Sequence, residues 1–175
     1  MASIHVSASA LSIAVPAAAT IIVAILSALA AYLGVKRERR RSLYSDAVKA
    51  AVAWEEMLYR VRRRGEGAER GLIDRFHELQ DSLTFYDAWV GSDSKYMSRS
   101  YRKLTTGVKK ATEDLIKSAW QDPIRPVPGD ARDGEAHPDI GRYVDAFLAD
   151  VRSHLSPLPW RKLAVAGRNR KTDAS

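Results

Sequence analysis

The pattern of apolar and polar residues divides the chain into one long apolar run and several shorter amphipathic stretches. Between Leu11 and Val35 the sequence contains no Asp, Glu, Lys, Arg, His, Asn or Gln. About 20 such residues in an α-helix, at about 1.5 Å each, span the roughly 30 Å hydrocarbon core of a bilayer. We therefore expect residues 11–35 to form a transmembrane helix, preceded by a short external N-terminus of residues 1–10.

A cleavable signal peptide is the main alternative for this apolar run. Such peptides begin with a basic region, whereas residues 1–35 contain no Lys or Arg. The small residues Ala17, Ala18 and Ala19 could supply a cleavage site, but the most apolar stretch, Ile21 to Leu33, follows them. The pattern thus favours a retained membrane span.

A basic juxtamembrane block at residues 36–41 predicts the orientation of the span. It contains Lys36, Arg37, Arg39, Arg40 and Arg41. Basic residues next to a span are retained on the cytoplasmic side, so we expect the N-terminus outside and the C-terminal domain in the cytoplasm. Alanine is abundant and arginine outnumbers lysine, a bias common in GC-rich bacterial genomes. These observations predict a single-pass protein of the bacterial inner membrane.

Small residues recur at heptad-like spacing within the span. Stripes of this kind let two helices approach closely inside a membrane, where lipid removes the usual hydrophobic drive for association. An Ala-rich segment also produces such stripes without any function, so both interpretations stay open. The candidate helix–helix interface consists of Ala17, Thr20, Ala24, Ser27 and Ala31.

Beyond residue 41, apolar residues recur at alternating spacings of about 3 and 4, which is typical of amphipathic helices in bundles and coiled coils. We expect three helices within residues 42–120, with Ser42 marking a potential break from the span. Gly91–Ser94 predicts a tight turn in which Asp93 or Ser94 caps the next helix. The three apolar stripes are Tyr44, Ala47, Ala51, Trp54, Leu58 and Val61; Leu72, Phe76, Leu79, Leu83, Tyr86 and Val90; and Met97, Tyr101, Leu104, Val108, Ala111 and Leu115.

The predicted fold class is therefore all-α: one N-terminal transmembrane helix followed by a small cytoplasmic antiparallel bundle of three helices, or four. A linker rich in Pro and Gly is expected at residues 121–137. An amphipathic helix at 138–155 follows, and we expect it to dock on the bundle. The basic C-terminal tail, residues 156–175, is predicted either to lie on the inner leaflet or to be unstructured.

The net charge of +7 limits the partners. A basic protein held at a membrane meets anionic phospholipid first, so membrane lipid is a more plausible partner than nucleic acid. No row of aromatic residues accompanies the basic residues to stack on bases. The predicted anionic-lipid contacts are Arg99, Arg102, Lys103, Lys109, Lys110, Trp160, Arg161 and Lys162.

No catalytic, metal-binding or nucleotide-binding motif stands out in the sequence. Cysteine is absent, and the run Asp74, His77, Glu78 and Asp81 supplies only half of a carboxylate-bridged metal site, on the side away from the apolar stripe. We therefore expect neither an enzyme nor a cofactor, a metal or a small-molecule substrate.

The composition and patterning together suggest a function through protein–protein contact. We expect an anchor, scaffold or regulatory subunit whose cytoplasmic bundle binds a protein partner or a second copy of the chain. The alternative is a membrane-active effector, such as a phage-exclusion or lysis-type protein, that acts through oligomerisation of its transmembrane helix.

Overall fold

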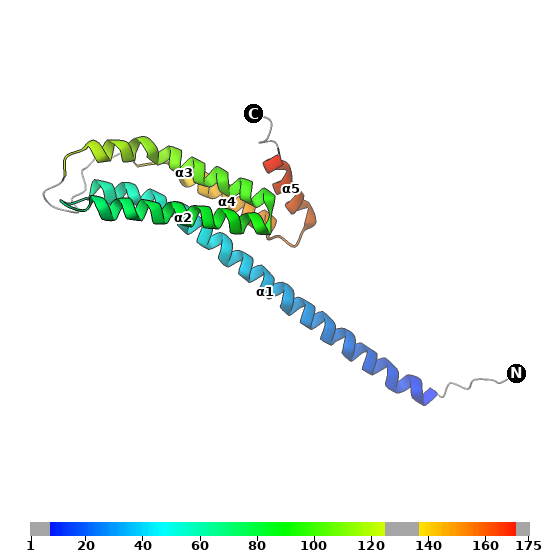
Figure 1. Cartoon of the computed structure of the whole chain (residues 1–175). Helices are drawn as coiled ribbons and strands as arrows, with labels where there is room; N and C mark the ends of the chain where they lie inside the picture. The colour runs from blue at the N-terminus through cyan, green and yellow to red at the C-terminus, as the bar shows by residue number, and fades with distance from the viewer. Residues whose placement is uncertain (1–7, 125–136, 171–175) are drawn as a thin grey trace. The chain divides into compact units, whose positions relative to one another are not determined.

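The chain folds into helices throughout the part that the computed structural model describes, residues 8–124 and 137–170 (Figure 1). Five helices follow in order: α1 (Ala8–Arg62), α2 (Glu69–Asp93), α3 (Lys95–Gln121), α4 (Gly141–His154) and α5 (Pro159–Arg170). No strand occurs within these described ranges. Most of the predicted linker, residues 125–136, lies outside them. The all-α prediction is confirmed.

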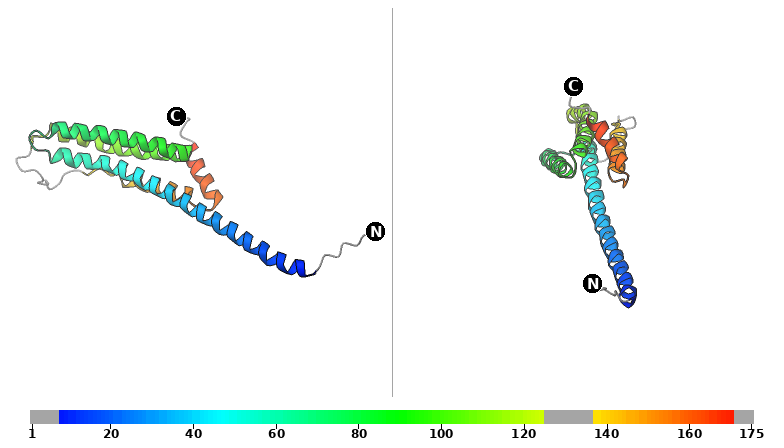
Figure 2. Two further views of the ribbon diagram at one scale, coloured as in Figure 1. Left: turned by 60° about the horizontal axis from the view of Figure 1, so that its bottom comes forward. Right: turned by 90° about the vertical axis from the view of Figure 1, so that its right-hand side faces the viewer.

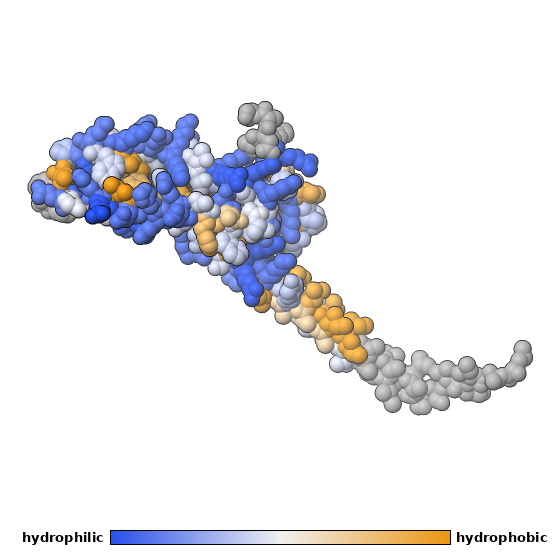
Figure 3. All heavy atoms as spheres, in the orientation of Figure 1, coloured by the Kyte–Doolittle hydropathy of each residue, from blue (hydrophilic) through white to orange (hydrophobic). Residues whose placement is uncertain are grey.

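The chain divides into two compact units, Met1–Arg40 and Arg41–Ser175. In the first unit, the side chains of residues 20–39 are exposed, and hydrophobic residues cover much of the surface of α1 there (Figure 3). Among the described helices, α1 is the one long and apolar enough to cross a membrane. The backbone of α1 stays helical through Ser42, so the break that the sequence left open does not occur.

In the second unit, α2 and α3 form a hairpin whose connection is the single residue Ser94 (Figure 2). Ser94 is the C-cap of α2 and the N-cap of α3, with an extended backbone (φ −163°, ψ 124°). Its hydroxyl oxygen accepts a hydrogen bond from the Met97 amide at 3.4 Å, satisfying a donor that lacks an intrahelical partner. The expected tight turn and the Ser94 cap are confirmed.

The core of the second unit is built from the apolar stripes predicted from the sequence. Tyr44, Ala47 and Ala51 of α1 meet Leu83 and Val90 of α2 and a continuous buried row on α3. A smaller cluster, centred on Leu58, Val61 and Ala119, fills the other end of the bundle. The buried row on α3 consists of Met97, Tyr101, Leu104 and Val108.

The helix α4 occupies a fourth position in the bundle, as the sequence predicted. Its Phe147 ring lies between Tyr44 and Tyr101, with ring centroids 6.2 Å and 5.7 Å away. The ring of Tyr143 packs so closely against Gly107 that a Cβ on Gly107 would overlap it. Glycine in a helix interior costs roughly 0.5–1 kcal/mol relative to alanine, and here it lets α4 approach α3.

The basic tail is not unstructured over its described residues, 156–170, whereas its placement on the inner leaflet stays a prediction. Residues 159–170 form α5, which packs against α3 and α4 and buries Val165 and Asn169. The buried carboxylate of Asp150 on α4 holds this helix. It accepts hydrogen bonds from the Arg168 guanidinium at 2.6 Å, the Asn169 amide at 2.8 Å and the Ser100 hydroxyl at 2.8 Å.

A buried arginine, Arg64, closes the far end of the bundle. The residue is only 7% exposed, and its guanidinium donates hydrogen bonds to four backbone carbonyls. It also lies 5.3 Å from the centre of the Trp120 ring. The carbonyl oxygens that accept these bonds belong to Val61, Ala119, Trp120 and Asp122. Three of them lie at the end of α3, where carbonyls lack intrahelical partners and the helix dipole favours a cation.

Tyr101 is a core residue whose buried polar atom forms no hydrogen bond within the described part of the chain. Its hydroxyl is fully buried and finds no hydrogen-bond partner among the described residues. This burial, reinforced by the nearby Asp87 carboxylate and by Tyr86, raises the pKa of Tyr101 far above the ordinary tyrosine value. We therefore expect Tyr101→Phe to increase the free energy of unfolding by about 1 kcal/mol, because an uncompensated buried hydroxyl is removed.

The same substitution should also reduce the loss in free energy of unfolding that occurs at alkaline pH. Above about pH 10 an unfolded tyrosine loses its proton while folded Tyr101 retains it, so stability falls as pH rises. Urea unfolding at pH 7 and pH 10.5 measures both effects, with Tyr96→Phe as the control for a partly buried tyrosine. A lower midpoint for Tyr101→Phe at pH 7 would contradict this account.

Candidate functional site

The carboxylates and histidines that could bind a metal are scattered. Within residues 8–124 and 137–170, no group of three or more His, Cys, Asp or Glu side chains is placed to hold an ion. Asp74, His77, Glu78 and Asp81 lie exposed along α2, as the sequence suggested.

A half-buried polar cluster joins three helices next to the α2–α3 turn. The Tyr44 hydroxyl donates to the Asp93 carboxylate at 2.5 Å, and His154 Nε2 lies 3.2 Å from the same oxygen. The rings of Tyr44 and His154 also meet edge to face, with centroids 5.9 Å apart. These contacts connect α1, α2 and α4, so the cluster has a structural role.

The small-residue stripe of α1 lies on an exposed surface. The side chains of Thr20, Ala24, Ser27 and Ala31 are all accessible, whereas the side chain of Ala17 lies outside the described part of the chain. In the basic block, Lys36, Arg37, Arg39 and Arg41 are exposed and Arg40 is half-buried.

The structure does not gather the predicted lipid-binding residues into one open face. Arg99 and Lys103 both donate to Asn169 of α5, to its carbonyl at 3.2 Å and its side-chain oxygen at 3.1 Å. Arg102 pairs with Asp87 at 2.8 Å, and Lys109 bends over the Trp54 ring. Among residues 8–124 and 137–170, no such contact is formed by the exposed side chains of Lys110 on α3 and of Trp160, Arg161 and Lys162 on α5.

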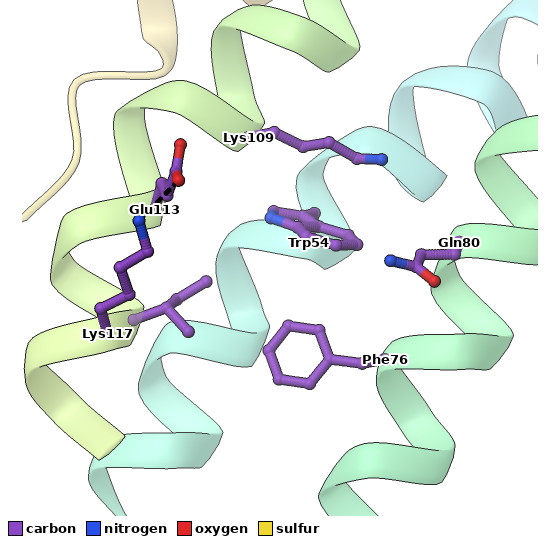
Figure 4. Close-up of a pocket in the computed structure, with 7 residues that line it drawn as sticks. Trp54, Phe76, Gln80, Lys109, Glu113 and Lys117 are labelled. Atoms are coloured by element: carbon purple, nitrogen blue, oxygen red, sulfur yellow. Dashed lines mark hydrogen bonds and ion pairs between the residues drawn. The ribbon is translucent and has the colours of Figure 1, made fainter. Parts of the chain in front are cut away.

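A pocket of about 360 Å³ opens between α1, α2 and α3 (Figure 4). Two aromatic rings form its centre: Trp54 and Phe76 meet edge to face with centroids 5.5 Å apart. The ammonium of Lys109 lies 4.7 Å from the centre of the Trp54 ring, within the range of a cation–π contact. The pocket is lined by Trp54, Phe76, Gln80, Lys109, Glu113, Ile116 and Lys117.

The rim of this pocket is polar and carries opposite charges. The Lys117 ammonium donates to the Glu113 carboxylate at 2.7 Å, which lowers the pKa of Glu113 and raises the pKa of Lys117. Lys109 and Gln80 lie on the side of Trp54 away from this ion pair (Figure 4). The rim therefore offers, next to an apolar floor, the ammonium of Lys109, which pairs with no carboxylate in the described part of the chain.

Sequence reasoning missed this pocket. The apolar stripes place Trp54 and Phe76 in the core, and both pack against the core clusters as predicted. Lys109 was predicted to be a lipid contact on an outer basic face, whereas it lies over the Trp54 ring and lines the pocket. Both aromatic side chains stay only half-buried, because the pocket between α1, α2 and α3 leaves part of each uncovered. The sequence did offer one signal for the pocket: two large aromatic residues, Trp54 and Phe76, were both predicted to face inward.

A second hollow, of about 440 Å³, lies between α3, α4 and α5. Its lining includes Asp150, Arg168 and Asn169, whose polar groups already bond to one another. Because these bonds hold α5 in place, the hollow is better explained as part of the packing of α5 than as a ligand site.

The outer side of α2 is the other unusual surface, and we call it the α2 outer face: Asp74, Glu78, Asp81, Phe85 and Trp89. At about 100° per residue these five positions fall within about 80° of arc. All are exposed, and Phe85 and Trp89 expose 55% and 53% of their surfaces. Their ring centroids are 6.0 Å apart. The sequence analysis missed the two aromatics because it followed only the buried stripe.

Comparisons with protein-family models, with curated proteins and with solved structures found no match for this chain.

Proposed function

We propose that this protein is a single-pass inner-membrane protein of a bacterium whose cytoplasmic helical bundle docks a protein partner at the membrane. The apolar part of α1 is the anchor, and the basic block after it places the bundle on the cytoplasmic side. On this proposal the molecule is an anchor, scaffold or regulatory subunit and not an enzyme.

The observation that supports docking most directly is the aromatic pair Phe85 and Trp89. Both side chains lie exposed on the α2 outer face, outside the buried core cluster to which Leu83 and Val90 of the same helix belong. Aromatic residues are enriched among the few interface residues that dominate binding energy, and truncating one typically costs about 2 kcal/mol or more. An adjacent pair, flanked by Asp74, Glu78 and Asp81, fits the apolar centre and charged rim of an interface.

The alternative effector function has weaker support. It depends on oligomerisation through the small-residue stripe of α1, whose described residues are all exposed. An Ala-rich helix exposes small residues whether or not it oligomerises. The aromatic pair therefore supports docking more strongly than the stripe supports an effector.

The docking proposal is tested by affinity purification of the full chain from detergent-solubilised membranes. We expect the double substitution Phe85→Ser and Trp89→Ser to lose the co-purifying partner, because two anchors of about 2 kcal/mol each correspond to a loss in affinity of roughly 10³-fold. Ile73→Ser is the matched control, since Ile73 is an exposed apolar residue of α2 outside the arc of the α2 outer face. Recovery of the same partner with wild type and the double variant would refute the proposal.

A further inference from the structure

We propose that the pocket between α1, α2 and α3 binds a small amphipathic organic anion, with its apolar body against Trp54 and Phe76 and its negative group at Lys109. This site is independent of the docking proposal. Phe76 and Gln80 lie on the inward side of α2, about half a turn away from Phe85.

The size of the pocket sets the size of the ligand. A closed apolar cavity of about 150 Å³ accommodates benzene, and this pocket measures about 360 Å³. It therefore fits an apolar body of about two fused rings or a short acyl chain. Pockets that bind small molecules begin at roughly 300 Å³.

The lining explains why the ligand would be flat or flexible and apolar. Trp54, Phe76 and Ile116 come from three different helices and each leaves part of its side chain uncovered. The two aromatic planes meet at 70° and form a wedge. Covering these rings removes apolar surface from water at about 25 cal/mol per Å².

The charges on the rim explain why the ligand would be an anion. Glu113 is neutralised by Lys117, whereas the contact of Lys109 is with the Trp54 ring and not with a carboxylate. Lys109 reaches across the pocket from α3, and the amide of Gln80 lies on the same side (Figure 4). An ammonium and an amide N–H together can bind a carboxylate by charge-assisted hydrogen bonds.

Two sources can supply such a ligand, and both share the chemistry of one carboxylate on an apolar body. A soluble aromatic acid would come from the cytoplasm, and a medium-chain fatty acid from the membrane. The probes are therefore 2-naphthoate and octanoate, each compared with its neutral amide, 2-naphthamide and octanamide.

The experiment is isothermal titration of the full chain in nanodiscs with these four probes. Empty nanodiscs provide the blank for partition into lipid. We expect at least one acid to bind saturably and about tenfold more tightly than its amide, because only the acid pairs with the ammonium. Tighter binding of naphthoate identifies the soluble source, and tighter binding of octanoate identifies the membrane source.

Two lysine variants test whether this pocket is the site that binds the acid. Lys109→Met should remove the preference for acid over amide while keeping the length of the side chain. Lys110→Met is the matched control, since Lys110 is the neighbouring exposed lysine and does not line the pocket; it should retain the preference. Trp54→Leu should weaken the binding of acid and amide alike.

Three outcomes would overturn the proposal: absence of saturable binding, equal affinity of acid and amide for wild type, or equal losses of the preference in the two lysine variants. None of these results depends on whether Phe85 and Trp89 bind a partner.

Discussion

Replacing Ile22 and Leu26 together by Arg is expected to release the chain from the membrane, since α1 is the proposed anchor. Both residues lie near the middle of the 11–35 segment, one turn apart on α1, and both are exposed. An arginine at the centre of a spanning helix costs about 2.5–3.5 kcal/mol, and the lost Ile or Leu had contributed about 0.3–0.6 kcal/mol. The two substitutions together therefore oppose insertion by roughly 6–8 kcal/mol.

The measurement is the fraction of chain that stays with membranes after alkaline carbonate extraction. Ile22→Ala with Leu26→Ala is the matched control, which keeps the segment uncharged and should stay inserted. A high-salt wash separates insertion from peripheral binding, because the basic block of residues 36–41 can still hold the variant to anionic lipid by a salt-sensitive attraction. Carbonate-resistant retention of the Arg variant would show that another part of the chain is the anchor.

Replacing Arg64 by Ala is expected to lower the free energy of unfolding of the bundle by about 3 kcal/mol. Hydrogen bonds from a charged donor contribute about 1.5–3 kcal/mol each but are not additive. Here one guanidinium serves four carbonyls, on Val61 and at the end of α3, and stacks near Trp120. Its removal leaves several of those oxygens uncompensated at once.

Chemical denaturation of the full chain in detergent, followed by circular dichroism, measures this loss. Arg63→Ala is the control, because Arg63 is the exposed neighbour with the same charge. Arg64→Lys should fall between the two, since one ammonium cannot occupy the positions of a planar guanidinium. Equal denaturation midpoints for Arg64→Ala and Arg63→Ala would contradict the role assigned to Arg64.

Periodicity was sufficient to predict the helices and most of the core. A spacing of 3 and 4 determines which side of a helix faces inward, and the buried row Met97, Tyr101, Leu104 and Val108 follows directly from it. The cap at Ser94 was also predictable, because Ser and Asp satisfy free amides at helix starts through local hydrogen bonds.

Features that depend on contacts between distant segments were not predictable in this way. The tail helix α5 is held to the bundle by hydrogen bonds from Arg168 and Asn169 to Asp150. No local sequence pattern predicts that pairing. In the sequence Arg64 is one of several basic residues, although its burial against the end of α3 sets it apart. The pocket beside Trp54 is formed by side chains of three helices, and periodicity within one helix does not predict how three helices pack together.

The single residue between α2 and α3 makes this hairpin intolerant of changes in chain length. An inserted residue could lengthen the connection, so that Ser94 no longer caps both helices. Otherwise it would extend one helix and rotate the residues beyond it by about 100° around the helix axis. The second outcome would rotate the buried row of α3 away from Leu83 and Val90, which it now contacts. Among variants of this chain, insertions and deletions should therefore be rare at Ser94.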